Sequence, residues 1–170
     1  MALVRMSELL NRAREKGIGC GAFSVYSMEA VMGATMAARD KNTPIILQLA
    51  ESRFKMAPLE LVGPMMINAA KTAEVDIAVH LDHGSGMEPI KKALEMGFTS
   101  VMYDGSALPM EENIENTKIV KGMAFPFDAD VEAELGLVIT EYQMNIWSCM
   151  EAAESQMKIS GSASGTGSQK

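Results

Sequence analysis

The stretch "DIAVHLDHG" (residues 76–84) decides how this chain is interpreted. It begins as the apolar run of a buried strand and ends in His80, Asp82 and His83, which include the only two histidines of the chain. A buried parallel strand is normally apolar along its length, because a charged group in the interior is costly unless it is paired or coordinated. The stretch therefore indicates a strand whose carboxyl end forms the edge of a site.

Strand-like and helix-like segments alternate on both sides of this stretch. Composition and turn residues predict strands at 20–25, 43–50, 76–82, 99–104 and 129–135. Apolar residues at helical spacing predict helices at 3–13, 27–41, 58–73, 85–97 and 109–122. Ser27 is a predicted N-cap, and "SGME" (85–88) is a predicted capping box. Such alternation predicts an α/β fold with parallel strands and helical crossovers.

Two architectures fit an alternating chain of this kind. A doubly wound sheet usually has a glycine-rich phosphate turn after its first strand, but "YSMEAVMG" (26–33) contains no G-x-G-x-x-G. Polar residues instead follow or end several strands: Asp82 and His83 on the third, Asp104 on the fourth, Glu132 and Glu134 on the fifth. Strand ends that converge on one mouth are typical of a (β/α)8 barrel. A complete barrel takes about 250 residues, so this chain is expected to supply only the first five or so βα units.

Composition limits the classes of partner. The 170 residues carry a formal net charge of -7, with no block of Lys or Arg, which argues against binding to nucleic acid. No run approaches the roughly 18 apolar residues of a membrane span, and the first residues lack a signal sequence, so a cytoplasmic location without membrane contact is expected. The methionines Met28, Met32 and Met36 have helical spacing and are expected to fill the core.

Domain organisation follows from where the alternation stops. Residues 1–141 are expected to form the N-terminal part of the barrel. Residues 142–170 are expected to form a divergent helix followed by a flexible Gly/Ser tail.

The ionisable residues of the third strand allow two interpretations. In the structural one, His80 is a hydrogen-bonded inner residue with Asp82 as its partner, and His83 is simply exposed. In the functional one, His83 binds a metal ion and Asp82 transfers protons beside it. Asp104 and Glu134 are further candidate ligands, although carboxylates at strand ends also cap helices. A lysine Schiff base is disfavoured, because the lysines fall on predicted helices and loops.

Several ordered motifs resemble one family of enzymes. These are "AFSVYSMEAV", "PIILQLAESRF", "VHLDHG", "GFTSVMYDGSALPMEENIENTKIV" and "VEAELG", which together span the chain from near its N-terminus to about Gly136. They resemble the class II, metal-dependent ketose-bisphosphate aldolases, the fructose- and tagatose-bisphosphate aldolase family. The resemblance implies a zinc-dependent (β/α)8 barrel.

The resemblance also implies a lyase reaction in carbohydrate metabolism, as in glycolysis. A ketose 1,6-bisphosphate, fructose or tagatose, would be cleaved reversibly to dihydroxyacetone phosphate and glyceraldehyde 3-phosphate. Asp82 would be the catalytic aspartate, the proton donor to the aldehyde oxygen in cleavage. His83 would be the first Zn²⁺ ligand, and Asp104 and Glu134 would match carboxylates of a second or alternative metal position. No substrate-binding residue is assigned.

The chain departs from the family pattern at its later positions. It has no histidine after His83, whereas the family takes two further zinc histidines from later strands. The alternative to an active aldolase is therefore a catalytically inactive, truncated relic, or an accessory chain that acts through association. Unpaired first and fifth strands are expected to favour a homo-oligomer.

Overall fold

The computed structural model describes residues 2–136, and residues 2–135 belong to one compact unit. Along the chain, the elements are α1 (Met6–Glu15), β1 (Gly21–Ser24), α2 (Met28–Asp40), β2 (Ile45–Ala50), η1 (Glu51–Arg53), α3 (Leu59–Thr72), β3 (Ile77–Gly84), α4 (Met87–Met96), β4 (Ser100–Tyr103), α5 (Met110–Ala124), η2 (Phe125–Phe127) and β5 (Asp130–Ala133). The predicted boundary at 141/142, and the helix and tail predicted beyond it, lie outside the described residues.

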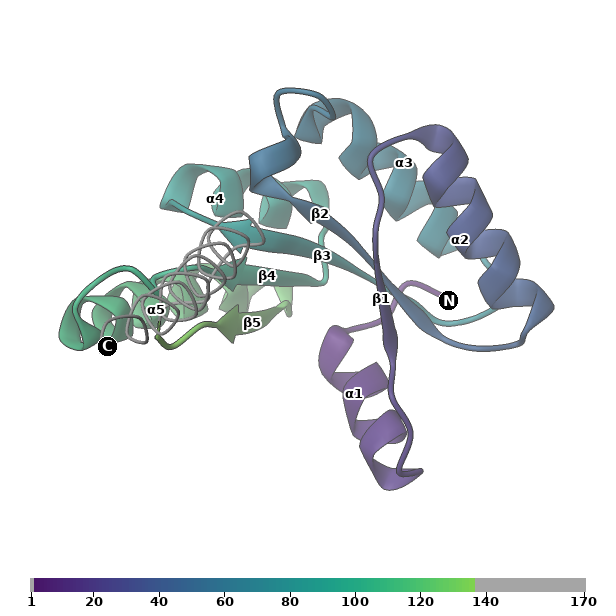
Figure 1. Cartoon of the computed structure of the whole chain (residues 1–170), viewed down its shortest axis with the longest axis horizontal. Coiled ribbons are helices and arrows are strands. Elements are labelled where there is room, and N and C mark those ends of the chain that lie inside the picture. The colour runs from purple at the N-terminus through teal and green to yellow at the C-terminus, as the bar shows by residue number, and fades with distance from the viewer. Residues whose placement is uncertain (1, 137–170) are drawn as a thin grey trace, which may run out of the picture. The chain divides into compact units, whose positions relative to one another are not determined.

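The five strands form one parallel sheet in the order of the sequence, β1-β2-β3-β4-β5 (Figure 1). The predicted α/β fold with parallel strands is thereby confirmed. Each crossover contains a helix, and each new strand is added on the same side of its predecessor. A sheet that grows in one direction in this way can curve toward closure, whereas a doubly wound sheet reverses its order at a switch point.

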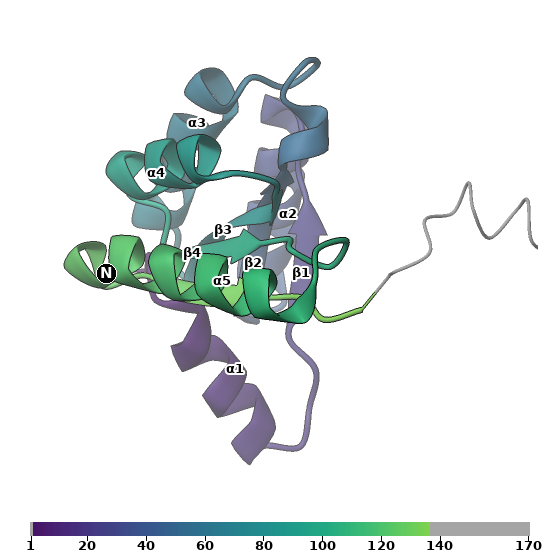
Figure 2. The same ribbon diagram turned by 90° about the vertical axis from the view of Figure 1, so that its left-hand side faces the viewer.

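Helices α2 to α5 cover one face of the sheet, as Figures 1 and 2 show. Their apolar sides pack on alternate strand residues such as Leu47, Val79 and Val101, all of which are fully buried. Helix α1 packs separately, placing Met6 and Leu9 in one cluster with Ile46 of β2 and Ala78 of β3. Helices on one face of a parallel sheet form the outside of a (β/α)8 barrel. The opposite face of the sheet carries the polar strand residues near the carboxyl ends.

Local signals explain most of the element boundaries. The Ser27 hydroxyl accepts a hydrogen bond from the Ala30 N–H, which confirms the predicted N-cap of α2. Helix α4 ends at Gly97, whose φ of 103° a residue with a side chain rarely adopts. Within residues 2–136, no helix has the length and apolar character needed to cross a bilayer.

The predicted capping box at residues 85–88 is wrong. The N-cap of α4 is Gly86, and it makes no side-chain capping bond. Ser85 instead gives both its N–H and its hydroxyl to the Glu51 carboxylate, at 2.6 and 3.0 Å. The β2–β3 pairing brings the Glu51 carboxylate close to Ser85, and a charged acceptor forms stronger hydrogen bonds than a neutral one. These bonds connect the loop after β3 to the segment that follows β2.

The methionine prediction is also wrong for α2. Met28, Met32 and Met36 are exposed by 55%, 51% and 48%, and they line a groove of about 450 Å³ between α2 and α3. The buried side of α2 is formed by the smaller Val31 and Ala38. Helical spacing shows which residues share a face, but it does not show whether another element covers that face.

Strand β1 lies at an edge of the described sheet, and all four of its residues are exposed. An edge strand offers unpaired backbone groups to another chain. We therefore expect the purified chain to self-associate in light-scattering measurements, and Phe23→Lys, which places a charge on this edge, to reduce the association. Phe125→Lys, on an 85% exposed ring outside the sheet, is the matched control and should change little. A stable, monodisperse monomer would contradict this expectation.

Candidate metal centre

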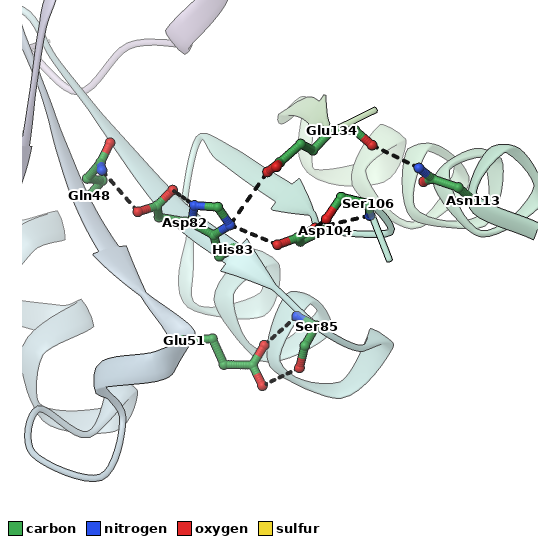
Figure 3. Close-up of polar contacts among 9 residues, drawn as sticks. All are labelled: Gln48, Glu51, Asp82, His83, Ser85, Asp104, Ser106, Asn113 and Glu134. Carbon is green, nitrogen blue, oxygen red and sulfur yellow. Dashed lines mark hydrogen bonds and ion pairs between the residues drawn. The ribbon is translucent and has the colours of Figure 1, made fainter. Parts of the chain in front are cut away.

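The carboxyl ends of β3, β4 and β5 bring three candidate ligands together (Figure 3). Tyr103 pairs with Gly84 on one side and with Ala133 on the other, so the residues next to these three share one rim of the sheet. One ligand atom each from His83, Asp104 and Glu134 lies within 4.8 Å of the other two. The parallel pairing thus gathers side chains that lie far apart in the sequence.

His83 reaches this cluster through an irregular backbone. Its φ is 48°, and the β3–β4 register shifts between Leu81 and Gly84. In a regular strand, Asp82 and His83 would face opposite sides of the sheet, but the bulge lets both side chains point into the mouth. Gly84 makes this possible, because a Cβ there would lie 2.6 Å from the Met102 carbonyl oxygen.

The spacing of the donor atoms suits a single cation. His83 Nδ1 lies 2.9 Å from Asp104 Oδ2 and 3.6 Å from Glu134 Oε2. Two ligands bound to one tetrahedral Zn²⁺ ion lie about 3.3 Å apart, given metal–ligand bonds of about 2.0–2.2 Å. One imidazole and two carboxylates form a ligand set used for Zn²⁺ and related divalent metals, and three protein ligands leave a position for substrate.

Asp82 lies beside this cluster, between Gln48 and His83. The Gln48 amide donates to Asp82 Oδ2 at 3.0 Å and to Ser24 Oγ at 3.1 Å, which links β1, β2 and β3. The other carboxylate oxygen, Oδ1, lies 3.9 Å from His83 Nε2. Gln48 was not among the predicted site residues, although a single polar residue within the apolar run "IILQLA" could have indicated it.

Electrostatics distinguish three ionisable groups of the site, Asp82, His83 and Asp104. Burial, with a smaller contribution from Asp104, raises the pKa of Asp82. Burial alone would raise the pKa of Asp104, but hydrogen bonds from Ser106 and His83 outweigh it and lower that pKa. The hydrogen bond to Asp104 raises the pKa of His83. Asp82 is thus the carboxyl group best suited to carry a proton, and Asp104 the one that stays ionised.

His80 has a different environment from His83. It is 2% exposed, and its Nδ1 hydrogen-bonds Ser100 Oγ at 2.9 Å, so the expectation that Asp82 is its partner is wrong. Its Nε2 lies 3.4 Å from a carboxylate oxygen of Glu132. Burial lowers the pKa of His80 to about 4, which keeps the imidazole neutral near pH 7. His80 is therefore an inner residue of the sheet, and His83 is the exposed ligand candidate.

Comparison with known proteins gives a consistent result. The family model described as "Fructose-bisphosphate aldolase class-II" matches residues 4–160. The chain is 43% identical over 134 residues to a fructose-bisphosphate aldolase of Thermus caldophilus, covering 79% of this chain and 44% of that protein. It is 36% identical over 138 residues to a sulfofructosephosphate aldolase of Alkalicoccus urumqiensis, covering 81% and 48%.

A solved structure supports the same architecture. The crystal structure of the YdjI aldolase from Escherichia coli K12 superposes with a TM-score of 0.76 at 34% identity, covering 79% of this chain and 52% of that chain. The chain thus spans about half the length of the relatives it matches. The prediction that it supplies about five βα units of this barrel family is confirmed.

The two histidines should titrate separately in the metal-free protein, as followed by NMR of their ring C–H signals. His80 is expected to change only near pH 4, and His83 at a pH above that of an ordinary imidazole. Asp104→Asn should lower the pKa of His83, because the hydrogen bond that favours the charged ring is weakened. Asp76→Asn, whose carboxylate pairs with Arg12 elsewhere, should leave both signals unchanged. Two histidines that both titrate near 6.5 would contradict the assignment.

Proposed function

The chain belongs to the class II fructose-bisphosphate aldolase family, and from this premise we propose that the mouth of its sheet catalyses metal-assisted aldol chemistry. The proposed reaction is the reversible cleavage of a ketose 1,6-bisphosphate, fructose or tagatose, to dihydroxyacetone phosphate and glyceraldehyde 3-phosphate. The observation that carries the proposal is the grouping of His83, Asp104 and Glu134 beside Asp82. We place the reaction in the cytoplasm, where phosphorylated sugars are metabolised.

The metal proposed is Zn²⁺, held by His83, Asp104 and Glu134. When bound, such a cation supplies Lewis-acid stabilisation of the negative charge that develops on the substrate's oxygens. The spacing of the three donors and the exposure of the His83 side chain support this assignment. The alternative is a lysine imine, but none of the five described strands carries a lysine.

Asp82 is the proposed proton-transfer residue, and the direction of transfer follows from the electron balance. In cleavage, the C4 hydroxyl loses its proton while the electron pair of the C3–C4 bond passes to the ketone fragment. Asp82 must therefore accept a proton in cleavage and donate one to the aldehyde oxygen in condensation. This corrects the sequence-based expectation of a donor in cleavage. The raised pKa of Asp82 suits this role, because the carboxyl group has to hold the proton that it accepts in cleavage and donates in condensation.

The surroundings of Asp82 support this role. Gln48 holds one carboxylate oxygen, so the other is left facing His83 and the mouth. The side chain is 17% exposed, which limits competition from water while leaving a path to a substrate. Fixing one oxygen orients the second toward a reacting hydroxyl, which is how a positioned base gains rate over a free carboxylate.

The competing proposal is an inactive member of the family that acts through association. It is favoured by the single histidine among the three described candidate ligands and by the exposed edge at β1. Both proposals accommodate the same fold. They differ only in whether the chain catalyses the reaction.

A coupled assay for dihydroxyacetone phosphate tests the proposed activity. With Zn²⁺, we expect the chain to cleave fructose or tagatose bisphosphate slowly compared with family members that have three histidine ligands, because carboxylates and water replace imidazole. Asp82→Ala should reduce the rate by about 10²–10⁴-fold or to background, because proton transfer is lost. Asp40→Ala, on the exposed end of α2, is the matched control.

The outcomes separate the two proposals. Turnover that survives Asp82→Ala would refute the role of Asp82. A chain that binds Zn²⁺ without any turnover would favour the inactive member, and turnover as fast as in a three-histidine enzyme would contradict the expected effect of the ligand set.

A further inference from the structure

Asn113 is a buried polar residue at the back of the candidate metal centre. It lies in the first turn of α5 and is only 4% exposed. Its side chain leaves the helix and crosses to the end of β5, where Nδ2 donates to the Glu134 carbonyl oxygen at 2.8 Å (Figure 3). A buried amide is costly unless its groups are paired, so this bond has a stabilising and orienting role.

The acceptor lies where the sheet can no longer satisfy it. The last β4–β5 pair is Tyr103 with Ala133, and Glu134 follows directly after it. The Glu134 carbonyl is therefore beyond the ladder, and Asn113 takes the place of the missing strand partner. Fixing the peptide group of Glu134 also fixes the base of its side chain, whose Oε2 lies 3.6 Å from His83 Nδ1.

The amide is itself held in one orientation. Thr117 Oγ1 donates to Asn113 Oδ1 at 3.3 Å, which directs the NH₂ group toward Glu134. Gly105 provides the room, because a Cβ there would lie 2.3 Å from Asn113 Oδ1 and 2.6 Å from its Cγ. Gly105 directly follows Asp104, so Asn113 contacts the backbone behind both carboxylate ligands.

We propose that Asn113 is a positioning residue of the metal centre. It sets the separation between Glu134 and Asp104, because its side chain hydrogen-bonds the backbone of Glu134 and packs against Gly105, the residue after Asp104. The inference rests on the proposed metal site and extends it to a residue that does not contact the metal. Residues that orient ligands in this way commonly contribute 10–100-fold to metal affinity.

The test is Zn²⁺ affinity, measured by competition with a chromogenic chelator on the folded, metal-free protein. Asn113→Ala is expected to weaken Zn²⁺ binding by about 10-fold or more. The matched control is Asn116→Ala on the same helix, which also removes one side-chain hydrogen bond, from Asn116 Nδ2 to the Tyr103 hydroxyl, but not one to a ligand. It should leave Zn²⁺ affinity unchanged. Glu134→Gln, which removes a ligand charge, should weaken binding at least as much as Asn113→Ala.

A second variant covers failure of Asn113→Ala to fold. Thr117→Val removes only the donor to Asn113 Oδ1 and is expected to give a smaller loss of Zn²⁺ affinity in the same direction. If Asn113→Ala binds Zn²⁺ as tightly as the unaltered protein, the inference is overturned and the metal site remains. Thr117→Val is judged in the same way if Asn113→Ala does not fold. Equal losses of Zn²⁺ affinity for Asn113→Ala and Asn116→Ala would also overturn the inference. Equal affinities for Glu134→Gln and the unaltered protein would overturn the metal site itself.

Discussion

Parallel pairing of β3, β4 and β5 is the constraint on which the candidate site depends. Because the strands run in the same direction and are added in sequence order, their carboxyl ends meet at one rim. Residues at strand ends, which the sequence spaces about 20 to 30 positions apart, become neighbours without a long-range motif. A bulge at His83 then turns one further side chain into that rim, at the expense of a left-handed backbone at a residue with a side chain.

The charge balance of the mouth gives the site its chemical character. Asp82, Asp104 and Glu134 lie around one exposed histidine, His83, while Glu132 pairs with the buried His80. Carboxylates that share a small region raise one another's pKa unless a cation is present, and the pKa of Glu132 is raised by partial burial and by Asp82. A divalent cation at His83 would relieve this repulsion. The site therefore combines an excess of negative charge with a carboxyl group next to the candidate ligands, Asp82, that is suited to hold a proton.

Prediction from sequence succeeds where local pattern and topology coincide. The βα alternation predicts the parallel sheet, and the sheet places Asp82, His83, Asp104 and Glu134 at one edge. Contacts between strands are harder to predict. The polar Gln48 interrupts an apolar run, but its partner Asp82, like the Glu51 partner of Ser85, depends on the register of the strands. The exposed row of Met28, Met32 and Met36 is also mispredicted, because spacing along a helix does not show which elements pack against that face. Asn113 could not be predicted, because its partner exists only once β5 lies beside α5.

Binding of one metal ion by His83, Asp104 and Glu134 can be seen by anomalous diffraction at the zinc edge, from crystals of the protein soaked with Zn²⁺. We expect one strong peak with all three side chains about 2.0–2.2 Å from it, and its loss in crystals of His83→Ala. A zinc peak at other residues, or no peak in well-ordered soaked crystals, would show that these three residues do not form a metal site.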